Sequence, residues 1–181
     1  LYSQVKNNLI GRFDYEILFI DDGSVDGSYE TLLGLANEDN RVRLFRFTSN
    51  LGQHKALEKG FKEARGEIIV TMDADLQSDP QDISRFVEKI KEGHDMVCGW
   101  RFQRQDPWHK KLKSKLGNCI LRMVVKSGLH DLSCPFRAYR IELVKGLSFQ
   151  NKYEISFIPW LIFKRTKSVA EIQINANRRL F

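Results

Sequence analysis

The sequence contains little cysteine, and its three cysteines form no paired motif. Cys98, Cys119 and Cys134 are odd in number and widely spaced, without a C-x-x-C pair. This pattern argues against a disulfide scaffold and a structural zinc site, and it favours a reducing compartment. The four histidines likewise show no spacing typical of metal ligands. We therefore assign His54, His94, His109 and His130 to loops or the surface.

Long hydrophobic runs are also missing. A membrane-spanning helix needs about 18 or more apolar residues in a row, and the closest approach, ISFIPWLIF at 155–163, is interrupted by Ser156 and Pro159. This segment carries Trp160 and has basic neighbours, so it is either an interfacial element on a membrane surface or a core helix. The chain opens at Leu1 with no signal peptide. We expect a trimmed domain.

Length and composition indicate one soluble globular domain over residues 1–181, with 42% hydrophobic and 29% charged residues. The charge is unevenly spread. Residues 1–99 carry 12 Lys and Arg against 18 Asp and Glu, a net charge of −6, whereas residues 100–181 carry 17 against 5, a net charge of +12. This asymmetry predicts a metal or cation site in the first part and an anionic partner for the second.

Apolar runs alternate with helical periodicity over the first hundred residues. Four runs predict buried strands: 16–20, 42–47, 67–73 and 95–100. Apolar residues at helical spacing separate them, and Pro80 opens the last of these helices. This order predicts an α/β fold with a mostly parallel sheet and helices on both faces. Residues 1–13 are predicted to form a helix whose own preceding strand is missing.

Two acidic clusters lie where predicted strands end. Asp21 and Asp22 follow the first strand, and Asp73 and Asp75 follow the third. In a parallel α/β sheet, ligands gather at this carboxyl edge. Neighbouring carboxylates are unfavourable unless a cation or a hydrogen-bond donor neutralises them. The D-x-D spacing directs two carboxylates at one hard cation, which predicts Mg²⁺ or Mn²⁺ with positions left for water and phosphate oxygens.

Each cluster also has a purely structural interpretation. Residues 22–27 partly match a calcium loop, but Leu33 stands where such a loop needs a bidentate Glu, so we reject an EF-hand. Ser24 or Asp26 can instead cap the helix that follows. A lone D-x-D is weak evidence, whereas two acidic clusters at successive strand ends are much stronger.

A basic run follows the last predicted strand. Residues 101–126 hold eight Lys and Arg against one acid, Asp106, and their later part is predicted to be an amphipathic helix. The run is either a solvated face or an anion-binding surface. A nucleic-acid-binding module is the alternative from another functional class, but stacking surfaces need several aromatic residues and only Trp108 lies near this helix.

Three stretches resemble a known family: YEILFIDDGSVDGS (15–28), NLGQHKALEKGFKEARGEIIVTMDADLQSDP (50–80) and DLSCPFRAYR (131–140). They are similar to inverting nucleotide-sugar glycosyltransferases of the family 2 type, and most of all to polyprenyl-phosphate glycosyltransferases such as dolichyl-phosphate mannose synthases. The resemblance covers about residues 9–181. It implies the GT-A fold, a Rossmann-like, mostly parallel sheet with helices on both faces.

The resemblance assigns the donor side of the site residue by residue. The first acidic cluster is implied to hold the base and ribose, and the D-x-D motif the diphosphate and a metal. The residues implied to bind the nucleotide sugar are Asp21, Asp22, Asp73, Ala74 and Asp75. In the lipid-phosphate branch a Gln joins the metal shell, so the implied ligands of Mg²⁺ or Mn²⁺ are Asp73, Asp75 and Gln77.

The acceptor side is assigned in the same way. The residues implied to bind the acceptor phosphate are Arg101, Lys110, Ser114, Arg137 and Arg179, with Arg178 as the alternative to the last. Arg101 and Asp131 are the catalytic candidates. Asp131 stands where the family keeps an acid before the F-R motif, and it is a base, an orienting acid or a structural residue. Some relatives place the acid where this chain has Pro135.

Two departures from the family pattern affect the site. Family members begin with a strand of the P-V-Y-N-E kind, which supplies part of the nucleotide pocket, and they continue into a Gly-x-Ser-Lys-Tyr-like loop. This chain lacks that strand and ends at NRRLF. We therefore expect both ends of the site to be incomplete within residues 1–181.

The implied activity is metal-dependent transfer of a hexose from a GDP- or UDP-sugar to a polyprenyl or dolichyl phosphate. The implied place is the membrane surface, with the protein cytoplasmic and peripheral, and nucleic acid is not an expected partner. A phosphate monoester is already anionic above pH ~6, so it needs cations rather than a base. The alternative acceptor is a hydroxyl of a polysaccharide or protein glycan, which would need a general base.

Overall fold

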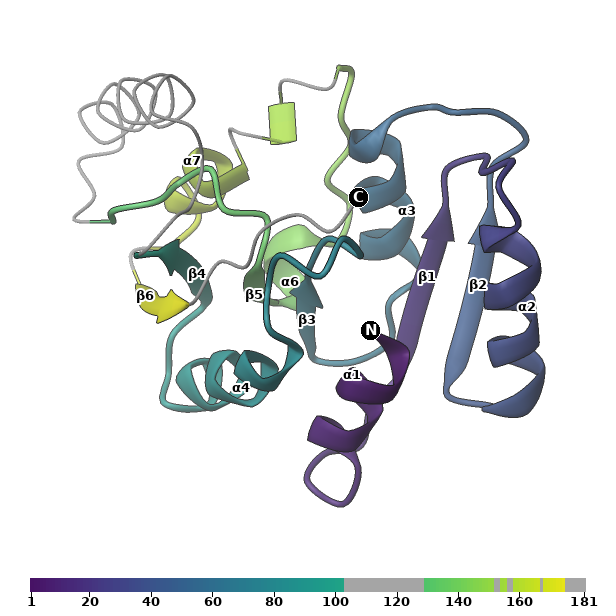
Figure 1. The fold of residues 1–181 in the computed structure, drawn as a ribbon. Coiled ribbons are helices and arrows are strands. Elements are labelled where there is room, and N and C mark those ends of the chain that lie inside the picture. The colour runs from purple at the N-terminus through teal and green to yellow at the C-terminus, as the bar shows by residue number, and fades with distance from the viewer. Residues whose placement is uncertain (103–128, 152–153, 156–157, 167, 175–181) are drawn as a thin grey trace.

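A computed structural model describes residues 1–102, 129–151, 154–155, 158–166 and 168–174 (Figure 1). Its first part comprises α1 (Tyr2–Leu9), β1 (Ile17–Asp21), α2 (Ser28–Glu38), β2 (Val42–Arg46), α3 (Gln53–Glu63) and β3 (Ile68–Thr71). Its second part comprises η1 (Pro80–Asp82), α4 (Ile83–Lys91), β4 (Met96–Arg101), β5 (Arg137–Arg140), α6 (Ile141–Val144), α7 (Ile158–Phe163) and β6 (Val169–Ile174). The predicted alternation of strands and helices up to β4 is confirmed, with strand ends within two residues of their expected places.

The strands form two sheets whose facing edges are not paired with each other in the described chain. β1 pairs with β2 in parallel, from Ile17 opposite Val42 onward. The other sheet has the order β3-β5-β4-β6, in which β4 and β6 are parallel and β5 runs antiparallel to both of its neighbours. The α/β class is as expected, but the sequence did not predict β5 and β6, and β5 makes the second sheet mixed.

Both faces of the second sheet are covered, as the alternation of its side chains requires. On one face, Val97 and Ala138 contribute to a core with α1 and α4, where Phe86 stacks on Phe136 at 4.3 Å. On the opposite face, ten residues form a second core: Phe61, Met96, Cys98, Leu129, Leu132, Tyr139, Val144, Phe149, Ile158 and Ile162. The predicted helices on both faces are therefore present, and they fix the strand ends that carry the site.

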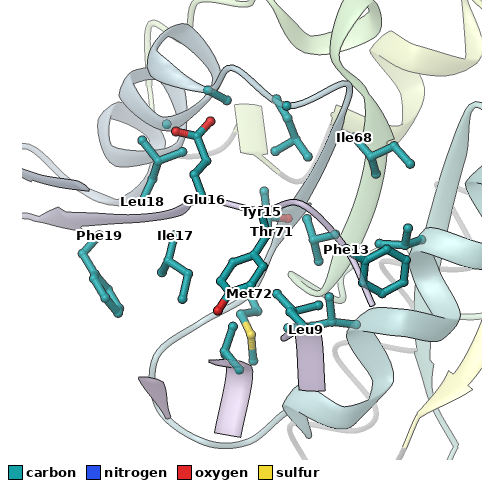
Figure 2. Close-up of a pocket in the computed structure, with 18 of the residues that line it drawn as sticks. Leu9, Phe13, Tyr15, Glu16, Ile17, Leu18, Phe19, Ile68, Thr71 and Met72 are labelled. Atoms are coloured by element: carbon teal, nitrogen blue, oxygen red, sulfur yellow. The ribbon is translucent and has the colours of Figure 1, made fainter. Parts of the chain in front are cut away.

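An apolar cavity of about 890 Å³ separates β1 from β3 (Figure 2). Its lining comes from α1, β1, α3 and β3, and Figure 2 shows Leu9, Phe13, Tyr15 and Met72 around it. The hydroxyl of Tyr15 is buried without a hydrogen-bond partner. A strand pairing with β1 on one side and β3 on the other would join the two sheets. The sequence predicts such a strand ahead of α1, and this stays a prediction.

Candidate functional site

The turn after β1 holds the first acidic pair. Asp21 ends β1, is 4% exposed, and accepts a hydrogen bond at Oδ1 from the backbone N–H of Ser24 at 3.1 Å. Its Oδ2 lies 3.3 Å from Nε of Arg46, in an ion pair that lacks hydrogen-bond geometry. The Arg46 guanidinium lies 4.1 Å from the centre of the Tyr29 ring. Asp21 therefore orders the turn and holds the Arg46 guanidinium beside the Tyr29 ring.

Asp22 fastens this turn to the loop ahead of α3. Its Oδ1 accepts from the backbone N–H of Leu51 at 2.7 Å, and its Oδ2 from that of Gly52 at 2.9 Å. Gly23 permits this approach: its φ is +76°, and a Cβ there would lie 2.8 Å from the carbonyl carbon of Ser49. A carboxylate oxygen can accept more than one hydrogen bond. Contact between Asp22 and a ribose stays a prediction.

The D-x-D turn is braced by the same loop. Asp73 Oδ1 accepts from the side-chain amide of Gln53, the first residue of α3, at 2.9 Å. Asp75 Oδ1 accepts from the backbone N–H of Gln77 at 3.1 Å, and Leu76 between them adopts a positive φ of 58°. Residues 51–53 thus hold both acidic turns together. No sequence pattern indicated these bracing residues.

Strand register places the D-x-D turn beside the end of β4. Thr71 at the end of β3 and Cys98 within β4 both pair with Arg137 at the start of β5. Because both strands run antiparallel to β5, their carboxyl ends point toward the same edge of the sheet. The chain leaves β3 toward Asp73 at this edge, and β4 reaches Arg101 there. The D-x-D turn and Arg101 therefore lie at the same edge of the second sheet, where ligands gather in α/β folds, and residues 51–53 link the first acidic turn to the D-x-D turn.

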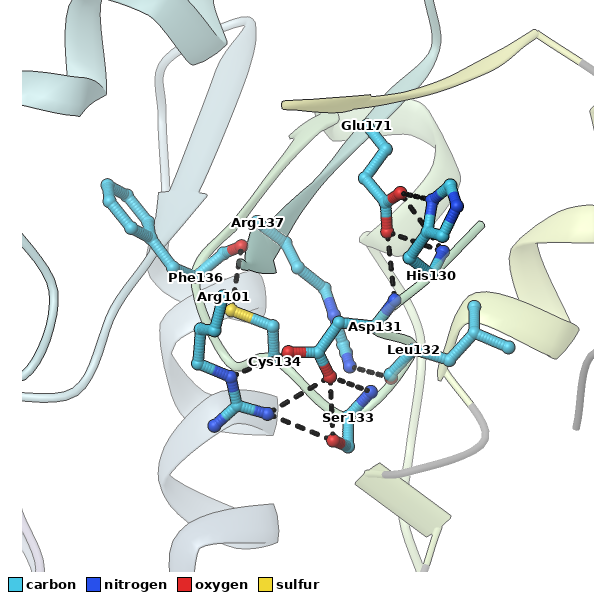
Figure 3. Close-up of polar contacts among 9 residues, drawn as sticks. All are labelled: Arg101, His130, Asp131, Leu132, Ser133, Cys134, Phe136, Arg137 and Glu171. Atoms are coloured by element: carbon cyan, nitrogen blue, oxygen red, sulfur yellow. Dashed lines mark hydrogen bonds and ion pairs between the residues drawn. The ribbon is translucent and has the colours of Figure 1, made fainter. Parts of the chain in front are cut away.

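At the β4 end, Arg101 and Asp131 form a bidentate ion pair (Figure 3). Nε of Arg101 donates to Asp131 Oδ2 at 2.7 Å, and Nη2 donates to Oδ1 at 3.0 Å. Nη2 also donates to the Ser133 hydroxyl at 3.0 Å, which in turn donates to Asp131 Oδ1 at 2.8 Å. The Arg101 and Asp131 side chains are 13% and 8% exposed. The two catalytic candidates thus form one hydrogen-bonded unit, which sequence spacing alone did not indicate.

Glu171 on β6 is a charged residue of this region that the sequence analysis missed. Its carboxylate accepts from the backbone N–H groups of His130 and Asp131, at 2.8 and 2.9 Å. It also lies 2.8 Å from Nδ1 of His130, whose ring stacks on Trp100 at 3.9 Å. His130 is exposed, as expected, and also makes specific contacts with Glu171 and Trp100. An isolated Glu in a short strand carries no sequence signal for such a role.

Arg137 lies beneath the site rather than on its surface. It is 3% exposed, and its Nη2 donates to the carbonyl oxygen of Leu132 at 2.6 Å. Its buried Nε has no hydrogen-bond partner. This burial favours a role in holding the turn at 131–134, and contact with an acceptor phosphate stays a prediction. Burial also raises the pKa of the Cys134 thiol to about 11, so this cysteine packs and is not a thiolate near neutral pH.

The residues of the D-x-D turn have ligand types that suit a hard divalent cation. Within the described residues, no cluster of three or more His, Cys, Asp or Glu side chains could hold a metal by itself. Asp73, Asp75 and Gln77 instead provide two carboxylates and an amide, which are oxygen donors preferred by Mg²⁺ and Mn²⁺. Magnesium bound by one or two carboxylates completes its shell with water and substrate phosphates. This set fits a cation that arrives with the substrate.

Three predicted residues lie outside the described residues: Lys110, Ser114 and Arg179. The segment 155–163 is described in part, and α7 within it buries Ile158 and Ile162 in the core while Trp160 is partly exposed. This packing favours the core-helix interpretation for that face of α7. In the part of the chain that the structure describes, no helix combines the length and apolar character that crossing a membrane requires.

Comparisons with known proteins identify relatives over most of the chain. The family model described as glycosyl transferase family 2 matches residues 2–147. An undecaprenyl-phosphate 4-deoxy-4-formamido-L-arabinose transferase of Proteus mirabilis (strain HI4320) is 37% identical over 162 residues, which cover 89% of this chain and 49% of that protein. The protein of the same name from Enterobacter sp. (strain 638) is 37% identical over 174 residues, or 96% of this chain and 53% of that protein. The chain thus spans about half the length of these relatives.

A solved structure shares the fold. Glucosyl-3-phosphoglycerate synthase from Mycobacterium tuberculosis, in complex with Mn²⁺, UDP and glucosyl-3-phosphoglycerate, superposes with a TM-score of 0.77. The match covers 99% of this chain and 65% of that one, at 18% sequence identity. The expected GT-A fold is confirmed by this likeness, which at such identity concerns the fold alone.

Proposed function

Because the chain belongs to glycosyl transferase family 2, we propose that it transfers a sugar from a nucleotide-diphosphate sugar to a polyprenyl phosphate. The observation that carries this proposal is the one sheet edge at which the D-x-D turn and the Arg101–Asp131 pair come together. A diphosphate leaving group and a phosphate acceptor both need positive partners. The names of the relatives, which specify undecaprenyl phosphate, support this class of acceptor.

The sugar and the base form the open part of the proposal. The sequence implied a hexose carried by GDP or UDP, whereas the relatives are named for a derivative of arabinose, a five-carbon sugar. We therefore include both sugar sizes among the candidate donors. The turn at Asp21 and Asp22, with Arg46 held over Tyr29, is the proposed place of the nucleoside.

Donor activation is proposed to rest on a braced acidic turn. A Mg²⁺ or Mn²⁺ ion held by Asp73, Asp75 and Gln77 would supply Lewis-acid stabilisation of the charge that develops on the leaving diphosphate. The chain's own residues keep that turn in place: Gln53 holds Asp73, and the backbone of Gln77 holds Asp75. Ligands fixed in advance need little rearrangement during the reaction.

The acceptor phosphate is proposed to approach the β4 end. It is already an anionic nucleophile at neutral pH, since its second pKa is near ~6. Arg101 is the proposed phosphate-binding and catalytic group, because a planar guanidinium pairs strongly with phosphate. Asp131 orients Arg101 through both of its carboxylate oxygens. Lys110, Ser114, Arg137 and Arg179 remain proposed further contacts to the phosphate.

A hydroxyl acceptor, on a polysaccharide or a protein glycan, is the second candidate. It would require Asp131 to remove a proton as general base. The bidentate bond to Arg101 engages both Asp131 oxygens and favours the orienting role instead.

The proposed location is the cytoplasmic face of a membrane, with the protein bound peripherally. A polyprenyl phosphate presents its headgroup at that surface. The partly exposed Trp160, with Nζ of Lys164 lying 3.5 Å from its ring centre, is a proposed interfacial contact.

The test is a matrix of donors and acceptors with the full-length protein. The donors are GDP-hexoses, UDP-hexoses and UDP-linked formamido-arabinose, each with Mn²⁺. The acceptors are undecaprenyl phosphate and a glycan, and a single-stranded oligonucleotide serves as a binding control. We expect sugar transfer to the lipid phosphate only, abolished by a chelator. Transfer to the glycan would establish the second candidate. Oligonucleotide binding without any transfer would contradict an enzymatic role.

A further inference from the structure

We propose that Glu171 is a positioning residue, which sets the backbone at 130–131 so that Asp131 holds Arg101 toward the acceptor. This inference rests on the proposed function. It starts from a carboxylate that is 9% exposed. A charge at this depth is costly unless hydrogen bonds compensate for it. Compensation comes from the segment that carries Asp131 (Figure 3).

The contacts of Glu171 converge on two consecutive residues. Oε1 accepts from the backbone N–H of His130 at 2.8 Å and from that of Asp131 at 2.9 Å. Oε2 lies 3.0 Å from the His130 backbone nitrogen and 2.8 Å from its Nδ1. Hydrogen bonds to an ionised acceptor are among the stronger ones in proteins. The Glu171 side chain of β6 therefore fixes the backbone of Asp131, and with it the starting point of the Asp131 side chain.

Glu171 and Arg101 lie on neighbouring parallel strands. β6 lies alongside β4 in parallel, with Glu171 opposite Cys98 and Ile174 opposite Arg101. Arg101 is thus fixed by β4, and Asp131 is fixed by β6 through Glu171. The ion pair joins the two. A displaced 130–131 backbone would move the Asp131 oxygens relative to a guanidinium whose own strand has not moved.

The His130 ring connects this turn to both strands. It stacks on Trp100, the neighbour of Arg101 in β4, with an interplanar angle of 12°. The ring thus lies in contact with both Trp100 and Glu171. Two independent contacts, one to each strand, hold His130 in place. This arrangement fits a precisely placed turn better than a general stabilising salt bridge.

The test compares Glu171→Ala with the near-isosteric Glu171→Gln, whose amide oxygen still accepts from the two backbone N–H groups. We expect Glu171→Ala to lower kcat/KM for the lipid phosphate about 10-fold or more and to leave the donor KM unchanged, because misplaced groups cost rate. Glu171→Gln should keep most of the activity. Gln173→Ala, at an exposed position of the same strand, is the matched control and should behave as the wild type.

A double variant separates positioning from a parallel effect. If Glu171 acts through Arg101, then Glu171→Ala in an Arg101→Ala background should add less than about 2-fold, which is within ordinary additivity error. A full additional loss would overturn the proposal. So would an equal loss of donor affinity, which indicates a general effect on folding.

A readout that needs no catalysis keeps the proposal distinct from the proposed function. Amide hydrogens of His130 and Asp131 should exchange about 10-fold faster in Glu171→Ala and near the wild-type rate in Glu171→Gln. If the wild type transfers no sugar but shows this pattern, the proposed function fails while the positioning contact stands. Unchanged exchange in Glu171→Ala would overturn the positioning role itself.

Discussion

Different groups hold the carboxylates at the two ends of the site. At the β1–β3 end, Asp22, Asp73 and Asp75 accept hydrogen bonds from amide groups at 51–53 and 77, and Asp21 lies beside the Arg46 guanidinium. At the β4 end, Asp131 binds a guanidinium and Glu171 contacts an imidazole. Amide donors thus order the D-x-D turn, the proposed place of a divalent cation, whereas Asp131 places the positive group of Arg101.

Packing differs between the same two regions. The apolar residues of β1 are only partly buried beside the cavity, whereas Met96, Val97 and Cys98 of β4 are fully buried. Similar apolar runs thus reach different burial because β4 has a strand on each side and β1 has a partner on one side only in the described chain.

The largest expected effect tests whether this packing difference persists at full length. We propose that a strand from outside residues 1–181 fills the cavity in the full-length protein. Ile17→Ala should then destabilise it by about 2 to 5 kcal/mol, as much as Ile90→Ala in the fully buried core. Urea unfolding measures both variants. If Ile17→Ala costs less than about 1 kcal/mol while Ile90→Ala costs about 2 to 5 kcal/mol, the cavity is not filled and the predicted strand is contradicted.

The next effect concerns the cation proposed for the β1–β3 end of the site. Asp75→Asn should reduce the transfer rate about 10²-fold or more, because the proposed metal loses a charged ligand. The measurement is the rate as a function of Mn²⁺ concentration. Glu30→Gln, which removes an exposed carboxylate from α2, serves as control and should change nothing. An unchanged Mn²⁺ dependence in Asp75→Asn would refute the assigned metal site.

At the β4 end, Arg101→Ala should raise the KM for the lipid phosphate about 10-fold or more, since a charge-assisted hydrogen bond is lost. The donor KM should hardly change. Steady-state kinetics with each substrate varied in turn gives both values, and Arg12→Ala, an exposed arginine of the α1–β1 connection, controls for net charge. An equal rise in the donor KM would indicate that Arg101 binds the donor diphosphate. The β1–β3 and β4 ends would then not serve different substrates.

The smallest expected effect is that of Asp131→Asn. If the acceptor ionises by itself, this variant should retain measurable turnover with a loss of about 10-fold, similar to that of Glu171→Ala, because Arg101 is held less firmly. The pH–rate profile should keep its limb near pH ~6, which belongs to the acceptor phosphate. A loss of about 10²-fold to 10⁴-fold together with the disappearance of that limb would instead identify Asp131 as a general base.

Features with a local pattern could be predicted from the sequence. Strands up to β4 were found because short apolar runs alternate with segments of helical periodicity, and the acidic clusters lie at strand ends as expected. The pairing of these clusters through Gln53 could not be predicted, since a side-chain amide at a helix start has no characteristic spacing from an aspartate 20 residues later.

Non-local pairing explains most of what the sequence analysis missed. β5 is four residues long and runs antiparallel between strands that lie about 40 to 70 residues earlier in the chain, so no period within a short window reveals it. The same holds for Glu171, whose contacts are about 40 residues away in the sequence. Arg137 is a further case, because the resemblance implied a phosphate contact but carried no sign of its burial; the phosphate contact stays a prediction.

The central position of β5 also bears on how the protein comes to be made. β5 lies between β3 and β4 in the sheet but is synthesised after both of them. During vectorial synthesis the loop at 51–53 can organise the first acidic turn early, whereas the Arg101 side must wait for residues 131–140 and then for β6. Contacts of such long sequence separation form slowly. We therefore expect a nascent chain to order the D-x-D turn before the Arg101–Asp131 pair, and chains halted before residue 171 to lack the contacts of Glu171 with the 130–131 backbone.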